Sequence, residues 1–154
     1  MNYSIELVLD GKLLKRGFWV YVIKAVESNG EALYYVGRTG DSSSNNAQSP
    51  FNRLTSHLSV KPKGNSLMKN LQSYGVKLED LILKMHFHGP VYLEQDTFEE
   101  HKIYRDKVAV LERKIANQLK QRRCIVMGLH TAPREAEREE IALANTIAER
   151  ALEL

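Results

Sequence analysis

The stretch that decides the fold runs from Phe18 to Leu58 and reads FWVYVIKAVESNGEALYYVGRTGDSSSNNAQSPFNRLTSHL. Its first run, Phe18 to Val26, and a second, Ala32 to Val36, are rich in the aromatic and β-branched residues that favour strands. Between the runs, residues 28–31 (SNGE) supply Asn and Gly, which tolerate the positive φ of tight turns. The stretch therefore predicts a β-hairpin at the centre of the fold.

After this hairpin the stretch predicts a polar loop and then a helix. Asp41 to Ser49 has no periodic apolar positions, so we expect a flexible loop that either lies against a substrate or is an ordinary surface loop. Pro50 fixes φ for a helix start, and this helix is expected to reach Val60. Arg53 and His57 are four residues apart, a spacing that puts both side chains on one helix face.

The rest of the chain predicts further elements around the hairpin. Ser4 to Lys15 alternates around Asp10-Gly11, which predicts a short hairpin or an edge strand that extends the sheet. We expect a helix from Asn65 to Tyr74 with an apolar face of Leu67, Leu71 and Tyr74, and a third strand from Leu81 to His88.

The last third of the chain predicts two helices with a short apolar run between them. The first begins at Asp96 or Thr97 and ends near Gln121, with an apolar stripe made of Ile103, Val108, Leu111, Ile115 and Leu119. Residues 124–127 (CIVM) are either a last strand or a segment that fills the core. The second helix, Arg134 to Leu154, either packs on the core or forms a homodimer seam.

These elements predict an α/β (α+β) fold with a small, mainly antiparallel three-stranded sheet flanked by helices. A chain of 154 residues suffices for one domain with a proper core. We divide it into an N-terminal hairpin extension (1–17), a central domain (18–128) and a C-terminal helix (129–154).

Charge is unevenly distributed along the chain, although the net charge is only +3. The segment from Ser42 to Leu78 carries +5 and no acid, and the segment from His101 to Arg123 carries eight Lys or Arg against two acids, which is +6. From Pro133 onward, three Arg against six Glu give −3. A basic middle is typical of a polyanion-binding surface, and solvated helix faces are the alternative.

Cysteine content and hydropathy indicate the compartment. The chain has one cysteine, Cys124, which excludes an internal disulfide and a cysteine-based zinc site. We expect no membrane span and no signal peptide, because apolar runs are short and an acid interrupts the first of them. A reducing, cytoplasmic location is therefore expected.

Four sequence features together resemble the GIY-YIG nuclease family. They are Trp19-Val20-Tyr21, with Trp where the family usually has Gly; Tyr35-Val36-Gly37, followed by Arg38; the Arg53/His57 pair; and Glu112 on the later helix. The resemblance covers residues 18–121. The Asn that many family members carry shortly after that helix has no clear counterpart here.

The resemblance implies a metal-dependent DNA endonuclease with five catalytic residues, Tyr21, Tyr35, Arg53, His57 and Glu112. Glu112 would hold one Mg²⁺ (or Mn²⁺), a cation that keeps most of its waters and needs few carboxylates. Arg53 suits bidentate phosphate contact, and we expect Arg53 and His57 to lower the tyrosine pKa values. We expect the five to meet on a concave, positively charged surface and duplex DNA to contact Arg38, Lys61, Lys63, Lys69, Arg113 and Lys120.

Other interpretations stay open at this point. The chain is alternatively a non-catalytic nucleic-acid-binding module of the same fold, or an unrelated α/β protein whose strand aromatics imitate the motif. His86 and His88 share a strand face and suggest metal ligands, but no third ligand lies at a recognisable spacing. Glu112 is otherwise a solvated helix residue paired with a lysine. The choice between DNA and RNA is not fixed by these residues.

Overall fold

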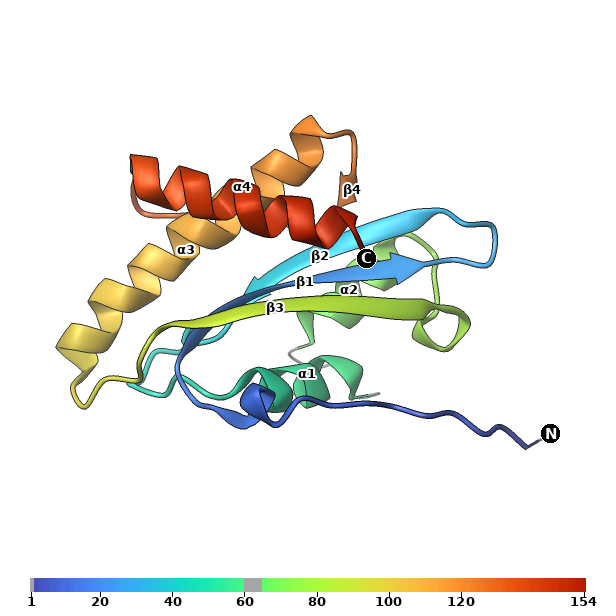
Figure 1. Ribbon diagram of the computed structural model, residues 1–154, viewed down its shortest axis with the longest axis horizontal. Helices are drawn as coiled ribbons and strands as arrows, with labels where there is room; N and C mark the ends of the chain where they lie inside the picture. Colours follow the sequence, from blue (N-terminus) through green and yellow to red (C-terminus); the bar gives the residue numbers. More distant parts are fainter. Residues whose placement is uncertain (1, 60–64) are drawn as a thin grey trace.

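The computed structural model describes residues 2–59 and 65–154, which form one sheet with helices on both faces (Figure 1). The strands lie in the order β3-β1-β2-β4. They are β1 (Phe18–Val26), β2 (Ala32–Arg38), β3 (Ile82–Tyr92) and β4 (Ile125–Val126). The α-helices are α1 (Pro50–Leu58), α2 (Ser66–Ser73), α3 (Phe98–Gln121) and α4 (Arg138–Leu152). The predicted α+β class is confirmed.

The predicted central hairpin is present. β1 pairs antiparallel with β2, with Tyr21 opposite Gly37 and Ile23 opposite Tyr35. In the turn, Gly30 takes a φ of 85°, a conformation that glycine adopts without strain. β3 pairs antiparallel with the other edge of β1, which gives β1 a partner on each side.

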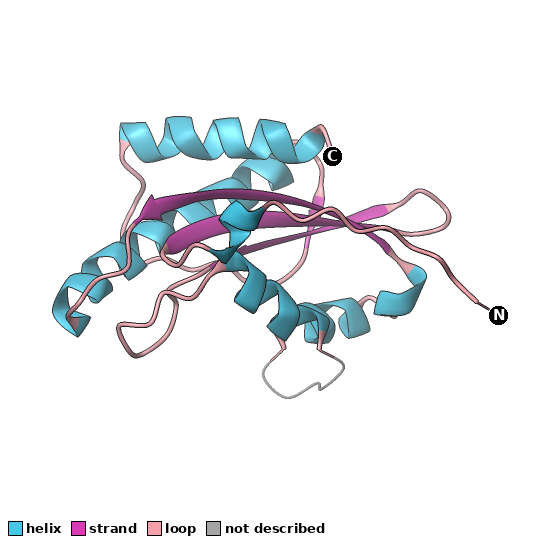
Figure 2. Ribbon diagram, turned by 60° about the horizontal axis from the view of Figure 1, so that its bottom comes forward, coloured by secondary structure: helices cyan, strands magenta, loops and turns pink. Residues whose placement is uncertain are grey.

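The strand alternation of β1 sends its side chains into two separate layers. Phe18, Val20 and Val22 pack beneath α3 and α4. Tyr21 and Ile23 point to the opposite face, where α1 and α2 cover the sheet. Figure 2 shows the sheet between these two helical layers. We call them the α3/α4 face and the tyrosine face.

Helix α3 begins where the sequence predicts, with the Thr97 side chain accepting from the Glu100 amide. Most of its predicted apolar stripe is buried: Val108, Leu111, Ile115 and Leu119. Ile103 is 57% exposed instead, because it lies on the side of α3 that faces away from the sheet, whereas His101 near the same end of the helix is fully buried.

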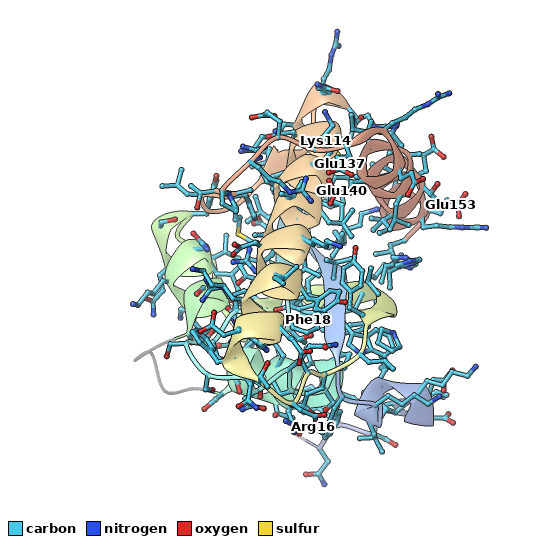
Figure 3. The ribbon with its side chains drawn as sticks, turned by 90° about the vertical axis from the view of Figure 1, so that its left-hand side faces the viewer. Arg16, Phe18, Lys114, Glu137, Glu140 and Glu153 are labelled. Carbon is cyan, nitrogen blue, oxygen red and sulfur yellow. The ribbon has the colours of Figure 1, made fainter. Side chains whose placement is uncertain are left out.

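Helix α4 begins at Arg138 rather than at the predicted Arg134. Glu137 and Glu140 form a capping box, and Arg134 pairs with Glu140 at 2.6 Å from outside the helix. Figure 3 shows Glu137 and Glu140 close to α3. Of the two predicted roles, the structure shows packing on the core, since the apolar side of α4 is buried within the chain: Ala144, Ile147, Ala148 and Ala151.

The predicted N-terminal hairpin is wrong. The only regular structure before β1 in the described residues is the 3₁₀-helix η1 (Gly11–Leu14). The Asp10 side chain accepts from the Lys12 amide and so caps a helical turn instead of a hairpin turn. Residues 2–10 lie exposed, without a partner strand among the described residues.

Three further features differ from the sequence prediction. β3 continues past Gly89-Pro90 to Tyr92, which pairs with Phe18 after an irregularity in the ladder. β4 joins β2 in parallel, so the sheet has a fourth strand and is mixed rather than three-stranded. Tyr74 is the C-cap of α2 and is 48% exposed, outside the apolar face.

Two other expectations concern the end of α1 and membrane spans. α1 ends at Leu58, and the predicted end at Val60 lies outside the described residues. No helix among the described residues has the length and apolar character needed to cross a bilayer.

Candidate functional site

A polar hollow of about 460 Å³ lies beside the last residues of β2. It exists because β4 pairs with β2 only at Leu33 and Tyr34, after which the chain at Gly128 moves away from the strand. His130 returns to β2, where its Nε2 lies 3.1 Å from the Val36 carbonyl oxygen. The lining comes from β2, α1, α2, α3 and two loops: Tyr35, Val36, Gly37, Arg38, Asp41, Arg53, Ser66, Asn70, Glu112, Met127, Gly128, Leu129, His130 and Thr131.

Tyr21 and His57 form a buried pair behind this lining. The Tyr21 hydroxyl lies 2.6 Å from His57 Nε2, and both side chains are nearly inaccessible. Burial, with the Arg53 charge, lowers the pKa of His57 to about 4. A neutral imidazole carries one N–H and one acceptor nitrogen, so the tautomer of His57 sets the direction of this hydrogen bond.

Gly37 leaves room for the Tyr21 ring, because it has no side chain. A Cβ at Gly37 would come within 2.5 Å of the Tyr21 Cζ and hydroxyl oxygen, because the ring crosses directly over the glycine of the neighbouring strand. The motif glycine therefore has a physical role that the sequence pattern alone did not explain.

Tyr35 is the motif tyrosine that faces the hollow. It lines the space, and its ring lies 5.2 Å from that of His57. Burial raises the pKa of Tyr35 to about 12 and raises that of Tyr21 further, although the Arg53 charge lowers both. The expected net lowering of the tyrosine pKa values is therefore wrong, since desolvation outweighs the nearby cation.

Arg53 projects from α1 into the hollow and is already paired. Its Nη2 donates to Asp41 Oδ2 at 2.6 Å, and its Nε is buried without a hydrogen-bond partner among the described residues. Asp41 begins the predicted flexible loop. The end of that loop is held at Asn46, which Arg16 contacts, and at Ala47, whose amide donates to Glu94 Oε1 at 3.0 Å. Arg16, labelled in Figure 3, pairs with the same glutamate at 2.7 Å.

Glu112 reaches the same hollow from α3, although α3 covers the other face of the sheet. Its carboxylate forms an ion pair with Arg38, the residue after the second motif. Burial raises the pKa of the Glu112 carboxyl to about 7, while Arg38 opposes that shift. The expected excess of positive charge is not present in the lining, where Arg38 and Arg53 are balanced by Asp41 and Glu112.

The residues present fit one hard cation. Glu112 offers a carboxylate beside an open polar space, and one carboxylate suits Mg²⁺ because this ion keeps several waters. The pKa of Glu112 is raised because burial disfavours the charged carboxylate more than Arg38 favours it. A bound cation would add positive charge and so favour the ionised form. The described residues contain no cluster of three or more His, Cys, Asp or Glu that would hold a metal on protein ligands alone.

The predicted DNA-binding residues separate into groups. Lys69 on α2 and Lys120 on α3 are exposed. Burial lowers the pKa of His130 in the hollow, and the Lys120 charge adds to that shift. Arg113 instead donates to the Arg134 carbonyl oxygen at 2.7 Å and pairs with Glu135. Lys61 and Lys63 lie outside the described residues.

His86 and His88 lie away from the hollow. They pair with Val22 and Val20 of β1 and so belong to the α3/α4 face. Burial lowers the pKa of each imidazole. No further candidate ligand joins them in the part of the chain that the structure describes.

Sequence reasoning missed several lining residues. Asp41, Asn70 and His130 have no motif of their own and reach the hollow only through the loop and helix paths. Their one signal is a nearby glycine with positive φ: Asp41 directly follows Gly40, whose φ is 78°, and His130 comes two residues after Gly128, whose φ is 84°.

Comparison with known proteins returned no match to a family model, a curated protein or a solved structure.

Proposed function

We propose that this chain is a metal-dependent DNA endonuclease with a GIY-YIG-like fold, and that the hollow beside β2 is its active site. The observation that carries the proposal is the meeting of all five motif residues around one hollow. Tyr35, Arg53 and Glu112 line the space, and Tyr21 and His57 form the hydrogen-bonded pair directly behind it. They come from β1, β2 and α1, which follow one another in the sequence, and from α3, which comes much later.

Each side chain has a role that its surroundings support. Arg53 is a phosphate ligand, because its guanidinium can donate to two phosphate oxygens at once. In this structure the Asp41 carboxylate takes the place of the phosphate. Tyr35 lines the space where a water would attack. Tyr21 and His57 orient that region and offer a route for a proton from the phenol to the imidazole.

Glu112 is the residue that would hold Mg²⁺ (or Mn²⁺). A bound cation would stabilise negative charge on the phosphate and the leaving oxygen. Arg38 then has a second use, since a guanidinium released from Glu112 is free to contact a neighbouring phosphate. Lys69 and Lys120 at the surface would add salt-dependent contacts to the duplex.

The second candidate is a non-catalytic nucleic-acid-binding module with the same fold. The observation that favours it is the set of closed ion pairs, Arg38 with Glu112 and Arg53 with Asp41, together with a Tyr35 pKa of about 12. A protein in this state binds phosphate only after these pairs open. Under either candidate we expect a cytoplasmic protein, from the single cysteine.

The test is incubation of the full chain with supercoiled plasmid, with Mg²⁺ and with excess EDTA. We expect nicked and then linear DNA with Mg²⁺ only. Duplex binding measured at low and physiological salt separates the candidates: binding without cleavage in Mg²⁺ or Mn²⁺ supports the second, and neither binding nor cleavage rejects both.

A further inference from the structure

The N-terminal tail, residues 2–10, is an apolar segment that the proposed site does not use. Its large side chains are exposed: Tyr3 79%, Ile5 86%, Leu7 84% and Val8 86%. The tail extends away from η1 past α1 (Figure 1). Such a run of exposed apolar residues is typical of a segment whose binding partner is absent.

The tail has the pattern of a β-strand. Tyr3, Ile5, Leu7 and Leu9 alternate with Ser4, Glu6, Val8 and Asp10. In an extended chain the first set forms one apolar face, and the second set, apart from Val8, forms a polar face. A strand of this kind needs a sheet edge on which to pair.

Strand β3 offers that edge. It is the outermost strand, and within the described residues it pairs only with β1. On the tyrosine face, Leu83, Met85 and Phe87 of β3 are only partly buried and pack against the edge of the core. On the other face Ile82 is 68% exposed, so both faces end in uncovered side chains. An open edge of this kind accepts an added strand.

One antiparallel register matches the two strands on both faces. It puts apolar residues opposite apolar residues and a glutamate opposite a lysine: Tyr3 with Phe87, Ile5 with Met85, Leu7 with Leu83, Glu6 with Lys84 and Val8 with Ile82. The parallel alignment that keeps the same faces puts Val8 beside His88 and Glu6 beside His86 instead. Cross-strand pairs of the first kind stabilise a sheet.

The tail cannot reach this register on its own chain. There Leu9 would lie beside Leu81, whereas Gly17 is held against Tyr92, since a Cβ at Gly17 would lie 2.8 Å from the Tyr92 carbonyl oxygen. Leu81 and Tyr92 are ~36 Å apart along an extended strand. The segment from Leu9 to Gly17 spans at most ~29 Å when fully extended, and η1 shortens it.

We infer that the tail pairs with β3 of a second copy, each chain giving its tail to the other. Donor strand and acceptor edge lie on the same chain, so a two-fold dimer satisfies both at once and covers both open edges. The contact uses β3 and leaves the hollow beside β2 free, so it is independent of the proposed nuclease function.

The first test is the mass of the full chain in solution across a dilution series, by light scattering. We expect twice the mass of one chain, and the mass of one chain for the double variant Ile5→Lys/Leu7→Lys. The matched variant Ile5→Val/Leu7→Val keeps the apolar strand pattern and should stay dimeric. A wild-type chain that is monomeric at every concentration, or a lysine variant that stays dimeric, would overturn the inference.

A second test fixes the register, using chains in which Cys124→Ser removes the native thiol. A Leu7→Cys chain is mixed with a differently tagged Leu83→Cys chain and oxidised. We expect a disulfide between the two tags, and no such product when Phe87→Cys replaces Leu83→Cys. Cross-linking to position 87 in preference to 83 would overturn the antiparallel register.

Discussion

The two faces of the sheet differ in what their side chains do. Most residues that fill the α3/α4 face are aliphatic, among them Val20, Ile115, Leu119 and Ile147, and they stabilise the fold through close packing. The tyrosine face buries polar groups beside apolar ones: Tyr21, Tyr35 and His57 lie within it, and Arg53 lies at its margin. Burying polar groups costs stability unless they are hydrogen-bonded. The α3/α4 face therefore stabilises the fold, and the tyrosine face positions the candidate site at some cost in stability.

The largest expected effect on stability comes from shortening a buried side chain on the α3/α4 face. Leu119→Ala should lower the free energy of unfolding by about 2–5 kcal/mol, because Leu119 is fully buried and its removal leaves a cavity. Nicking per folded molecule should stay near wild type. The control is Ile103→Ala on the same helix, where 57% exposure predicts a change within about 0.5 kcal/mol. Urea unfolding of both variants checks this, and equal losses would contradict it.

Gly37→Ala should act on the tyrosine face. The added Cβ would meet the Tyr21 ring at about 2.5 Å, so the ring or strand must shift, at a cost of about 1–3 kcal/mol. Nicking should be lost even where the protein is folded, because Tyr21 leaves its contact with His57. Gly11→Ala is the control, since an added Cβ there meets nothing within 4 Å. A Gly37→Ala protein that nicks at the wild-type rate would separate Tyr21 from the chemistry.

A smaller effect is expected in the pH dependence of stability. The pKa of His57 is lowered from 6.5 to about 4, so between these values the unfolded chain binds a proton that the folded chain does not. Stability is therefore lost as the pH falls through this window. His57→Gln should flatten that loss by up to about 1.4 kcal/mol per pH unit. Urea unfolding of both proteins from pH 7.5 to 4.5 measures it, and parallel curves would contradict it. The opposite contribution of Glu112, whose pKa is raised, is present in both proteins and cancels in the difference.

Local chemistry was enough to predict the centre of the fold from the sequence. β1, β2, α2 and α3 follow from strand-forming runs, a Gly-containing turn and capping residues, all of which act within a few residues. The tail was misread because alternation describes a strand but does not supply its partner. The parallel pairing of β4 depends on where α3 returns the chain, which no local pattern contains.

The sequence predicted part of the membership of the candidate site and none of its electrostatics. Of the five motif residues, Tyr35, Arg53 and Glu112 line the hollow and the Tyr21–His57 pair lies behind it, whereas the other lining residues carry no motif. Counting charges along the chain could not show that Arg38 and Arg53 each find a carboxylate there, because Asp41 and Glu112 come from separate segments. Nor does the sequence contain the depth of burial that raises the tyrosine pKa values.

The measurement that tests the central claim most directly is plasmid nicking by Glu112→Gln with Mg²⁺ in excess. The amide keeps the size of the side chain and removes the charge that would hold the cation, so we predict no nicking at any pH while duplex binding is retained. Glu99→Gln, in the first turn of the same helix, should cut like wild type. If Glu112→Gln nicks at near the wild-type rate while wild type needs Mg²⁺, the metal is held elsewhere and the hollow beside β2 is not the active site.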